Sequence, residues 1–229
     1  MHSVKLVSYT SPSSDLLEKA GDSLEEIVEL IAYCARVSSP NSQASMLNSE
    51  KLIEYLVKHK HWSPLEMVDA TLEIYTTRDI GRQILRHRSF VFQEFSQRYA
   101  NPVNTLDFVF REARLQDDSN RQNSISTDNQ YLKDEWLNKQ NNVMMAAKDA
   151  YSWAISAGIA KEQARSVLPE GLTMTKMYMK GSLRSWIHFI EIRSAKETQK
   201  EHREVAISCA EVIAEIFPMI TRSLSSGSN

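Results

Sequence analysis

The chain has 229 residues, of which 42% are hydrophobic and 24% charged, and 27 Lys and Arg nearly balance 29 Asp and Glu. This composition is ordinary for a globular protein with a sizeable core, and its near-neutral charge argues against a nucleic-acid binder with a basic surface. No apolar run approaches the roughly 18 residues that suggest a membrane span, and the N-terminus shows no secretory signal, so a cytoplasmic protein is expected.

The cysteines and histidines predict neither a disulfide framework nor a metal site. Cys34 and Cys209 are the only two cysteines, and no Cys-x-x-Cys pair occurs. Both lie on apolar faces of helical patterns, so they are expected to be buried structural thiols. His59 and His61 lack a further ligand at a familiar spacing, so no metal site is expected.

The first elements in chain order are two helices and a strand. Apolar residues at helical spacing predict a helix over 23–36, which begins at Ser23 in a capping box. A polar loop is expected over 40–45, and a second helix over 52–57. Strict alternation of apolar and polar residues over 68–75 then predicts a half-buried strand.

An arginine-rich helix is predicted after this strand. Thr77 can cap it, and its arginines recur every four residues on one exposed face, at Arg78, Arg82 and Arg86. The helix would deliver the run Arg86-His87-Arg88 at its C-terminal end, where positive charge also suits the helix dipole. The segment 78–99 holds five arginines against two carboxylates, which is a local excess of cations in a nearly neutral chain.

The second half of the chain alternates predicted strands and helices. We expect a strand over 105–110, then a long polar loop or insertion over 112–129, and then a helix over 131–157 that stops at Gly158. A short helix over 161–168 and a strand over 173–180 follow. The chain is expected to end with a helix from Ser182 to 192, a helix over 198–217 and a frayed tail over 223–229. Mixed helices and few strands indicate an α+β fold. A single domain over 1–229 is expected, with a small antiparallel-rich sheet flanked by helices.

The stretch that begins at Arg86-His87-Arg88 carries the densest chemistry. In an extended segment, Glu94, Ser96 and Arg98 would share one face and offer an acceptor, a hydroxyl and a guanidinium together. Arginine makes planar, bidentate contacts with phosphate, so an anionic small ligand such as a sugar phosphate is expected. The alternative is a solvated helix end followed by a turn.

Two later segments offer further ligands. Arg184 and His188 lie four residues apart, so they share a helical face, and the helix start at Ser182 is itself an anion site. The alternative is an ordinary amphipathic helix with Trp186 in the core. Arg165 is either a ligand or a surface ion-pair partner. No glycine-rich phosphate loop occurs, so side chains and helix ends would have to hold any nucleotide.

Arg86-His87-Arg88, followed after seven residues by Ser96, resembles the signature of the flavin-dependent thymidylate synthases. The likeness runs in order from about residue 36 to residue 217. It is carried further by His61-Trp62-Ser63-Pro64-Leu65-Glu66, Gln83, Ala164-Arg165-Ser166-Val167-Leu168-Pro169, residues 183–193 and Thr198-Gln199-Lys200-Glu201-His202. The resemblance implies that thymidylate is made from dUMP (deoxyuridylate), with methylenetetrahydrofolate as carbon donor, NADPH as reductant and a tightly held FAD. It also implies a homotetramer with active sites shared between subunits.

The resemblance also assigns residues. It implies contacts with FAD by Ser63, Arg86, His87, Arg88, Glu94, Ser182, Leu183, Arg184 and His188. It implies contacts with dUMP by Gln83, Ile84, Leu85, Arg86, Glu94, Phe95, Ser96, Gln97, Arg98, Arg165 and Arg193. Arg193 would be catalytic, because a fixed guanidinium can stabilise the electron density that builds on uracil when C5 is activated. A cysteine nucleophile is then not needed.

Some positions depart from the family's usual residues. Ser63 stands where some members have Thr, and Gln93 stands where Asn is frequent. Ser182 stands where Asn occurs in some members, so its contact with FAD could be through the backbone. The polar stretch 112–129 is longer than in compact members.

Two other functions stay open at this point. One is a flavoprotein of the same fold that acts on another uracil nucleotide. The other is a nucleic-acid-binding module that stacks bases on aromatic side chains: Phe90, Phe92, Phe95 and Tyr99. Bound flavin would exclude the binding module, and the identity of the product would separate the two flavoproteins.

Overall fold

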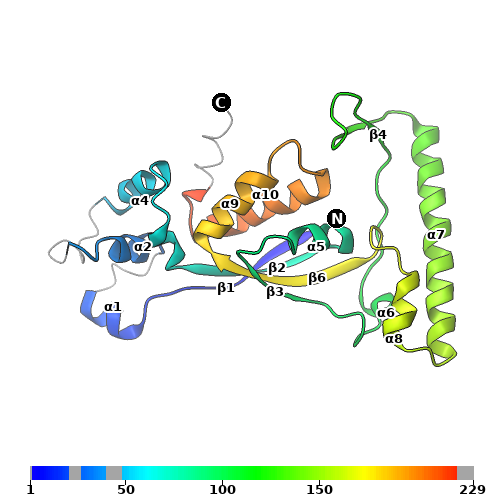
Figure 1. The fold of residues 1–229 in the computed structure, drawn as a ribbon, viewed down its shortest axis with the longest axis horizontal. Coiled ribbons are helices and arrows are strands. Elements are labelled where there is room, and N and C mark those ends of the chain that lie inside the picture. The colour runs from blue at the N-terminus through cyan, green and yellow to red at the C-terminus, as the bar shows by residue number, and fades with distance from the viewer. Residues whose placement is uncertain (1, 21–26, 40–47, 221–229) are drawn as a thin grey trace.

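A computed structural model describes residues 2–20, 27–39 and 48–220 of the chain. Its centre is a four-stranded antiparallel sheet with the strand order β1-β2-β6-β3. The strands are β1 (Ser3–Tyr9), β2 (Asp69–Thr77), β6 (Met174–Ser182) and β3 (Val91–Glu94). Helices lie over one face of this sheet and at both of its ends (Figure 1), so the expected mixture of helices and antiparallel strands is confirmed.

Alternation in β2 gives the sheet one packed face and one polar face. Leu72 and Ile74 are fully buried on the packed face. On the other face, Glu73 pairs with Lys176 of β6 at 3.6 Å, and Asp69 pairs with Lys180 at 3.2 Å. Opposite charges across neighbouring strands support the register, which a slip by one residue would invert.

Two helices cover the packed face of the sheet. β6 passes directly into α9 (Leu183–Arg193), and α10 (Lys200–Ala214) lies beside it (Figure 1). The Ser182 side chain caps α9 by accepting a hydrogen bond from the backbone N–H of Ser185. Trp186 is fully buried and donates from Nε1 to the carbonyl of Ala70 at 3.1 Å. One face of α9 therefore builds the core.

A helical cluster lies at one end of the sheet. It comprises α1 (Ser14–Ala20), α2 (Ile27–Ala35), α4 (Ser49–Lys58) and the short η2 (Ser63–Glu66). The predicted helices over 23–36 and 52–57 are confirmed where they are described. The predicted start at Ser23, the loop over 40–45 and the tail over 223–229 lie outside the described residues. Cys209 is buried as expected, but Cys34 is only half-buried.

The opposite end of the sheet carries the remaining elements. They are α6 (Pro102–Thr105), β4 (Arg114–Gln116), β5 (Ser124–Ser126), α7 (Gln130–Ser156), α8 (Lys161–Ala164) and η3 (Arg165–Val167). The long helix α7 stands at the edge of the molecule (Figure 1), and Gly158 follows its end at φ 82°, as the predicted stop requires. The polar stretch 112–129 is not simply a loop, because β4 and β5 pair within it as an antiparallel hairpin.

The predicted strand over 105–110 is wrong. Pro102 occupies the first turn of α6, and the Asn101 side chain accepts from the backbone N–H of Val103, so the chain begins a helical turn there. In the rest of this segment, Phe108 makes an isolated bridge with Thr173. Phe108 packs against a small cluster formed by α7, α8 and the segment after them: Tyr151, Ala154, Ala164 and Leu168.

Candidate active site

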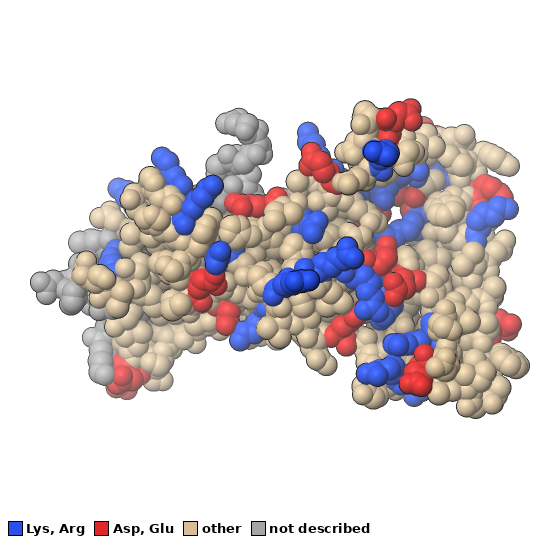
Figure 2. Space-filling model, viewed as in Figure 1, with Lys and Arg blue, Asp and Glu red and all other residues tan. Residues whose placement is uncertain are grey.

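The predicted site residues fall into three groups along β6 and α9. The α9-start group is Ser63, Arg88, Ser182, Leu183, Arg184 and His188. The α9-end group is Gln83, Ile84, Leu85, Arg86, His87 and Arg193. The β6-start group is Glu94, Phe95, Ser96, Gln97, Arg98 and Arg165. Figure 2 shows Lys and Arg side chains gathered over the middle of one face, over α5 (Arg78–Ile84), with acidic side chains beside them.

The α9-start group borders a cavity of about 430 Å³. Glu66, Ser89, Ser182, Arg184, Ser185 and His188 line it. Arg184 Nη1 lies 2.5 Å from Glu66 Oε1, and the Trp62 ring lies 4.7 Å from the His188 ring. Hydrogen bonds from Ser182 and then from Arg184 hold the pKa of Glu66 below its usual value. The carboxylate therefore stays charged and anchors the guanidinium at the cavity wall.

The lining of this cavity suits a phosphate-bearing cofactor. It offers three serine hydroxyls, a guanidinium and an imidazole around the N-terminus of an eleven-residue helix, all of which can donate to phosphate oxygen, and its one carboxylate, Glu66, is paired with Arg184. The Trp62 and His188 rings provide apolar surface beside these donors. The residues present therefore fit FAD. Leu183 is fully buried, so only its backbone can contact such a group.

In the α9-end group, Arg193 and His87 bond directly. Arg193 Nε donates to His87 Nε2 at 2.8 Å, which requires an unprotonated Nε2. Burial, and then the charge of Arg193, lower the pKa of His87, so its ring is neutral near pH 7. The His87 ring also lies edge-on to Phe189, with centroids 4.9 Å apart. A neutral histidine thus orients the guanidinium that the sequence singles out as catalytic.

The run Arg86-His87-Arg88 follows α5, since the helix ends at Ile84. Ile84 is fully buried, so its backbone alone is available to a ligand. Arg86 and Arg88 are exposed, as a role in binding anions requires.

The prediction that Arg78, Arg82 and Arg86 share one exposed face is wrong for Arg78. Arg78 is buried, because its guanidinium lies 3.5 Å from Glu94 Oε1 and 3.8 Å from Glu170.

Glu94, in the β6-start group, is engaged by the protein itself. Its Oε1 accepts from Thr175 Oγ1 at 2.9 Å and pairs with Arg78, while its Oε2 lies 3.6 Å from Arg82 Nη1. Glu94 therefore holds two guanidiniums of α5 in place. The sequence named it as a ligand of both FAD and dUMP, and the structure adds this internal role.

The expected extended face of Glu94, Ser96 and Arg98 is wrong. β3 ends at Glu94, and the chain turns after it, because the backbone N–H groups of Tyr99 and Ala100 both bond to the carbonyl of Ser96 at 3.1 Å. In this turn Gln97 is 3% exposed, and its Nε2 has no partner among the described residues. Arg98 is exposed and stacks on the Tyr99 ring at 5.6 Å.

Arg165 lies at the same end of the molecule as this turn. Lys161 Nζ in α8 donates to the carbonyl of Tyr99 at 3.1 Å, and Arg165 follows α8 directly. Arg165 is half-buried, and its Nε donates to the Glu162 carbonyl at 3.3 Å. Arg98, Ser96 and Arg165 thus lie on two segments that the Lys161 bond joins near the start of β6. The α9-start group lies at the other end of this strand (Figure 1).

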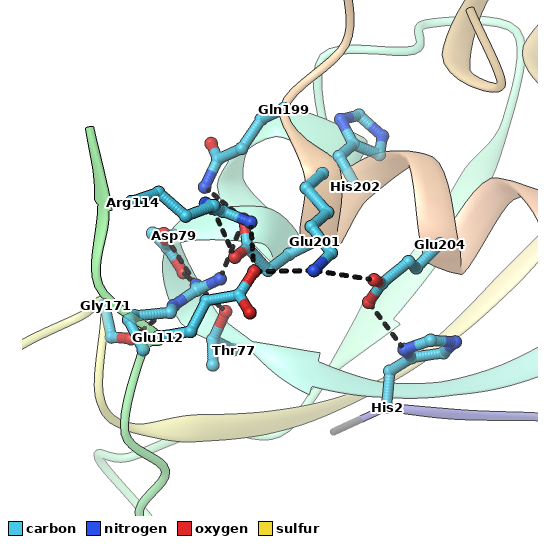
Figure 3. A network of polar contacts seen from close by, with 12 residues as sticks. His2, Thr77, Asp79, Glu112, Arg114, Gly171, Gln199, Glu201, His202 and Glu204 are labelled. Carbon is cyan, nitrogen blue, oxygen red and sulfur yellow. Dashed lines mark hydrogen bonds and ion pairs between the residues drawn. The ribbon is translucent and has the colours of Figure 1, made fainter. Parts of the chain in front are cut away.

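Figure 3 shows an ion-pair network that the sequence did not reveal, and Gln199 links it to Gln83 of the α9-end group by a hydrogen bond of 2.8 Å. Arg111 donates to Asp79 at 2.8 Å and to Thr77 Oγ1 at 2.6 Å, and it lies 3.1 Å from Glu201. Arg114 donates to Glu201 at 2.6 Å. These partners are far apart in the sequence, so no local pattern marks Arg111. The network fastens the hairpin segment to the starts of α5 and α10.

His202 is a second residue that the reasoning from residue types did not single out. It is fully buried in α10, and its Nδ1 lies 3.1 Å from Gln83 Oε1. Burial, and then the charges of Arg193 and His87, lower its pKa to about 3. Among the described residues no cluster of three or more His, Cys, Asp or Glu is arranged to hold a metal, and no helix is long and apolar enough to span a membrane.

Comparison with known proteins places this site in a family. Residues 15–219 match the family described as "Thymidylate synthase complementing protein". A probable flavin-dependent thymidylate synthase of Paramecium bursaria Chlorella virus 1 is 43% identical over 222 residues, which cover 97% of this chain and 98% of that protein. The flavin-dependent thymidylate synthase of a Synechocystis species is 49% identical over 196 residues, covering 85% and 88%.

A solved structure shares the fold. The UMP/dUMP methylase PolB from Streptomyces cacaoi, bound with 5-Br dUMP, superposes with a TM-score of 0.78 at 20% identity, covering 99% of this chain and 95% of that one. The fold and the relatives together define a class of FAD-dependent methyltransferases that act on dUMP. Within this class, the chain belongs to the flavin-dependent thymidylate synthases, so the family resemblance seen in the sequence is confirmed.

Proposed function

We propose that this chain methylates C5 of dUMP in a net reaction with two co-substrates. The methylene group comes from methylenetetrahydrofolate, and two electrons from NADPH complete its reduction to a methyl group. The products are thymidylate, tetrahydrofolate and oxidised NADP. FAD, when bound, supplies the hydride relay. The observation that carries the proposal is the bond between Arg193 and His87, because it holds the signature histidine and the catalytic arginine in one unit.

We assign flavin binding first to the α9-start group. The hydroxyl of Ser182, the guanidinium of Arg184 and the imidazole of His188 line the 430 Å³ cavity, and the donors of this cavity suit a diphosphate. Ser63 lies in η2, which packs against α9. Arg86, His87, Arg88 and Glu94 complete the set expected from the family. Leu183 contributes its backbone.

We assign nucleotide binding to the other two groups. Arg98, Arg165 and Ser96 suit the phosphate, because they are charged or hydroxylated groups at one end of β6. Gln83 to Arg86, Glu94, Phe95, Gln97 and Arg193 are the other residues expected to contact dUMP. Arg193 would stabilise negative charge on the uracil ring, and the neutral His87 fixes its orientation without competing for that charge.

The spread of these groups supports a shared active site. The nine residues of β6 separate the β6-start group from the α9-start group by roughly 26 Å at about 3.3 Å per residue. One compact site in one chain cannot contain both ends, so we propose that neighbouring subunits of a homotetramer combine them. The long α7 exposes large apolar side chains, with Tyr131 at 77% and Trp153 at 64%, which suits burial between subunits.

We further propose one domain over 1–229, with the hairpin segment 112–129 as an insertion relative to compact members of the family. Cys34 and Cys209 are both unpaired. Free thiols suit a reducing compartment, so we place the enzyme in the cytoplasm.

The test is an assay of purified protein with added FAD, NADPH, methylenetetrahydrofolate and dUMP, with thymidylate detected by mass spectrometry. Reactions that lack NADPH or the folate are the controls, and UMP replaces dUMP to test the other uracil nucleotide. We expect thymidylate only in the complete dUMP reaction. Product from UMP alone would favour the second flavoprotein function, and protein without flavin or product would refute both. Light scattering should give four times the 26.2 kDa mass of the chain.

A further inference from the structure

A line of hydrogen bonds runs through the interface between α5 and α10. His202 Nδ1 lies 3.1 Å from Gln83 Oε1. Gln83 Nε2 donates to Gln199 Oε1 at 2.8 Å, and Gln199 Nε2 donates to Glu201 Oε2 at 3.0 Å. Glu201 also accepts from Arg114 and pairs with Arg111. The line therefore begins at a buried imidazole and ends on a carboxylate that two guanidiniums hold in place.

The carboxylate fixes the direction of every bond in the line. An ionised Glu201 can only accept, so Gln199 must turn its NH₂ group toward it and its oxygen toward Gln83. Gln83 must then donate with its own NH₂ group, which leaves its oxygen facing His202. Two acceptors cannot bond to each other, so Nδ1 of His202 must carry the proton. The tautomer of a buried histidine is thus set by a charge at the far end of the line.

The surroundings of His202 agree with this neutral tautomer. The side chain is fully buried, and its Nε2 has no partner among the described residues. The rings of Phe189 and His87 lie 5.9 Å and 6.4 Å from its own, and Arg193 is the charged group that faces it. A second positive charge at this position would be both desolvated and repelled, so the ring does not become an imidazolium near pH 7.

We propose that His202 is a positioning residue for dUMP: through its Nδ1–H it fixes the Gln83 amide in one orientation. With both ends of the amide engaged, Gln83 keeps a single free N–H and a single free lone pair for a substrate, and it cannot rotate to exchange them. His202 also ties the end of α5 to α10, directly before the run Arg86-His87-Arg88. This inference rests on the proposed function, in which Gln83 contacts dUMP.

The test compares two variants of the FAD-loaded enzyme. His202→Leu has a similar volume but no donor, whereas His202→Asn keeps a side-chain N–H close to the position of Nδ1. The dissociation constant of dUMP is measured by titration calorimetry, and flavin content and urea unfolding are measured alongside. We expect His202→Leu to weaken dUMP binding about tenfold, the equivalent of one hydrogen bond, and His202→Asn to remain within about threefold of wild type. Flavin content should not change in either variant.

Gln199→Leu provides a second test at a half-buried position, because it interrupts the same line from the other side. We expect a similar loss of dUMP affinity in this variant. NMR of protein with ¹⁵N-labelled histidine should show a wild-type ring that is protonated on Nδ1 only and does not titrate near pH 7. In Gln199→Leu, the signal of the Nε2–H tautomer should appear as Gln83 becomes free to turn.

Three outcomes would overturn the inference. The first is wild-type affinity for dUMP in His202→Leu, and the second is equal loss in the Leu and Asn variants, which would indicate packing alone. The third is a wild-type His202 that carries its proton on Nε2. Its Nδ1 could then not donate to Gln83 Oε1, and the proposed hydrogen bond would not exist with or without dUMP bound. A wild-type enzyme that holds FAD but does not bind dUMP would instead refute the proposed function, and the role of His202 toward that substrate with it.

Discussion

Gly181 in β6 is the position where one added methyl group should do the most damage. A β-carbon built there would lie 2.5 Å from Cδ1 and 2.6 Å from Cε1 of Phe90. Phe90 cannot easily move aside, because it is 7% exposed and packs edge-on against Trp186 with centroids 4.8 Å apart. Overpacking of a filled core costs about 1–3 kcal/mol. We therefore expect Gly181→Ala to destabilise the protein by about 2 kcal/mol, although alanine would otherwise favour a strand.

The assay is urea unfolding at one fixed protein concentration, since association of subunits makes stability depend on concentration. In a thermal melt of a chain of this length, the same loss of about 2 kcal/mol would lower Tm by roughly 4–8 °C. Phe90→Leu in the same background is the control, because it removes the ring that the new methyl group would strike. The double variant should lose less than the sum of the two single variants. A Gly181→Ala protein within about 0.5 kcal/mol of wild type, or strict additivity, would refute the reasoning.

Three further predictions concern charge and reactivity. Arg193→Ala should lower thymidylate formation by about 100-fold or more while FAD stays bound, and Arg193→Lys should restore little because lysine lacks the planar fork; near-normal turnover would exclude the assigned role. Burial opposes ionisation of Glu201, but its bonds from its own backbone N–H and Gln199 and the charges of two arginines together set its pKa below 4.5. The stabilising effect of the charged Glu201 is therefore complete above about pH 4.5 and is lost as the pH falls through the folded-state pKa. The difference in urea midpoint between wild type and Glu201→Gln should accordingly shrink from about pH 7 to about pH 4, and a constant difference would contradict this. Burial also raises the pKa of the Cys209 thiol, so a thiol reagent should label it only after unfolding, and Cys209→Ala should still form thymidylate.

Local patterns predicted most of the regular structure. The alternation in β2, the stop at Gly158 and the cap at Ser182 are all decided by neighbours in sequence, and the structure has each of them. The predictions failed where distant partners decide. Arg78 shares a helical spacing with exposed arginines, but Glu94 and Glu170 draw it inward. The hairpin of β4 and β5 was missed because its strands are only three residues long each.

The candidate site shows the same division. The arginine-rich signature and the helix start at Ser182 are readable as motifs, since each is continuous in sequence. Arg111 has no such signal, because its partners Asp79 and Glu201 lie 32 and 90 positions away along the chain. The direction of the bonds around Gln83 also depends on contacts among separate elements. Sequence can name the groups in this site, and the fold decides how each one is oriented.

The passage of β6 into α9 has a consequence for how the family can vary. An α-helix advances about 1.5 Å and turns about 100° per residue, so the eleven residues of α9 set both the separation and the angle between Ser182 and Arg193. In the proposed assignment, α9 thus fixes the distance between the end that binds flavin and the end that binds the nucleotide. One inserted residue would leave Ser182 in place and swing Arg193 away from His87 by more than a quarter of a turn. A change in the length of α9 would therefore separate Arg193 from His87 even with every side chain of the helix unchanged.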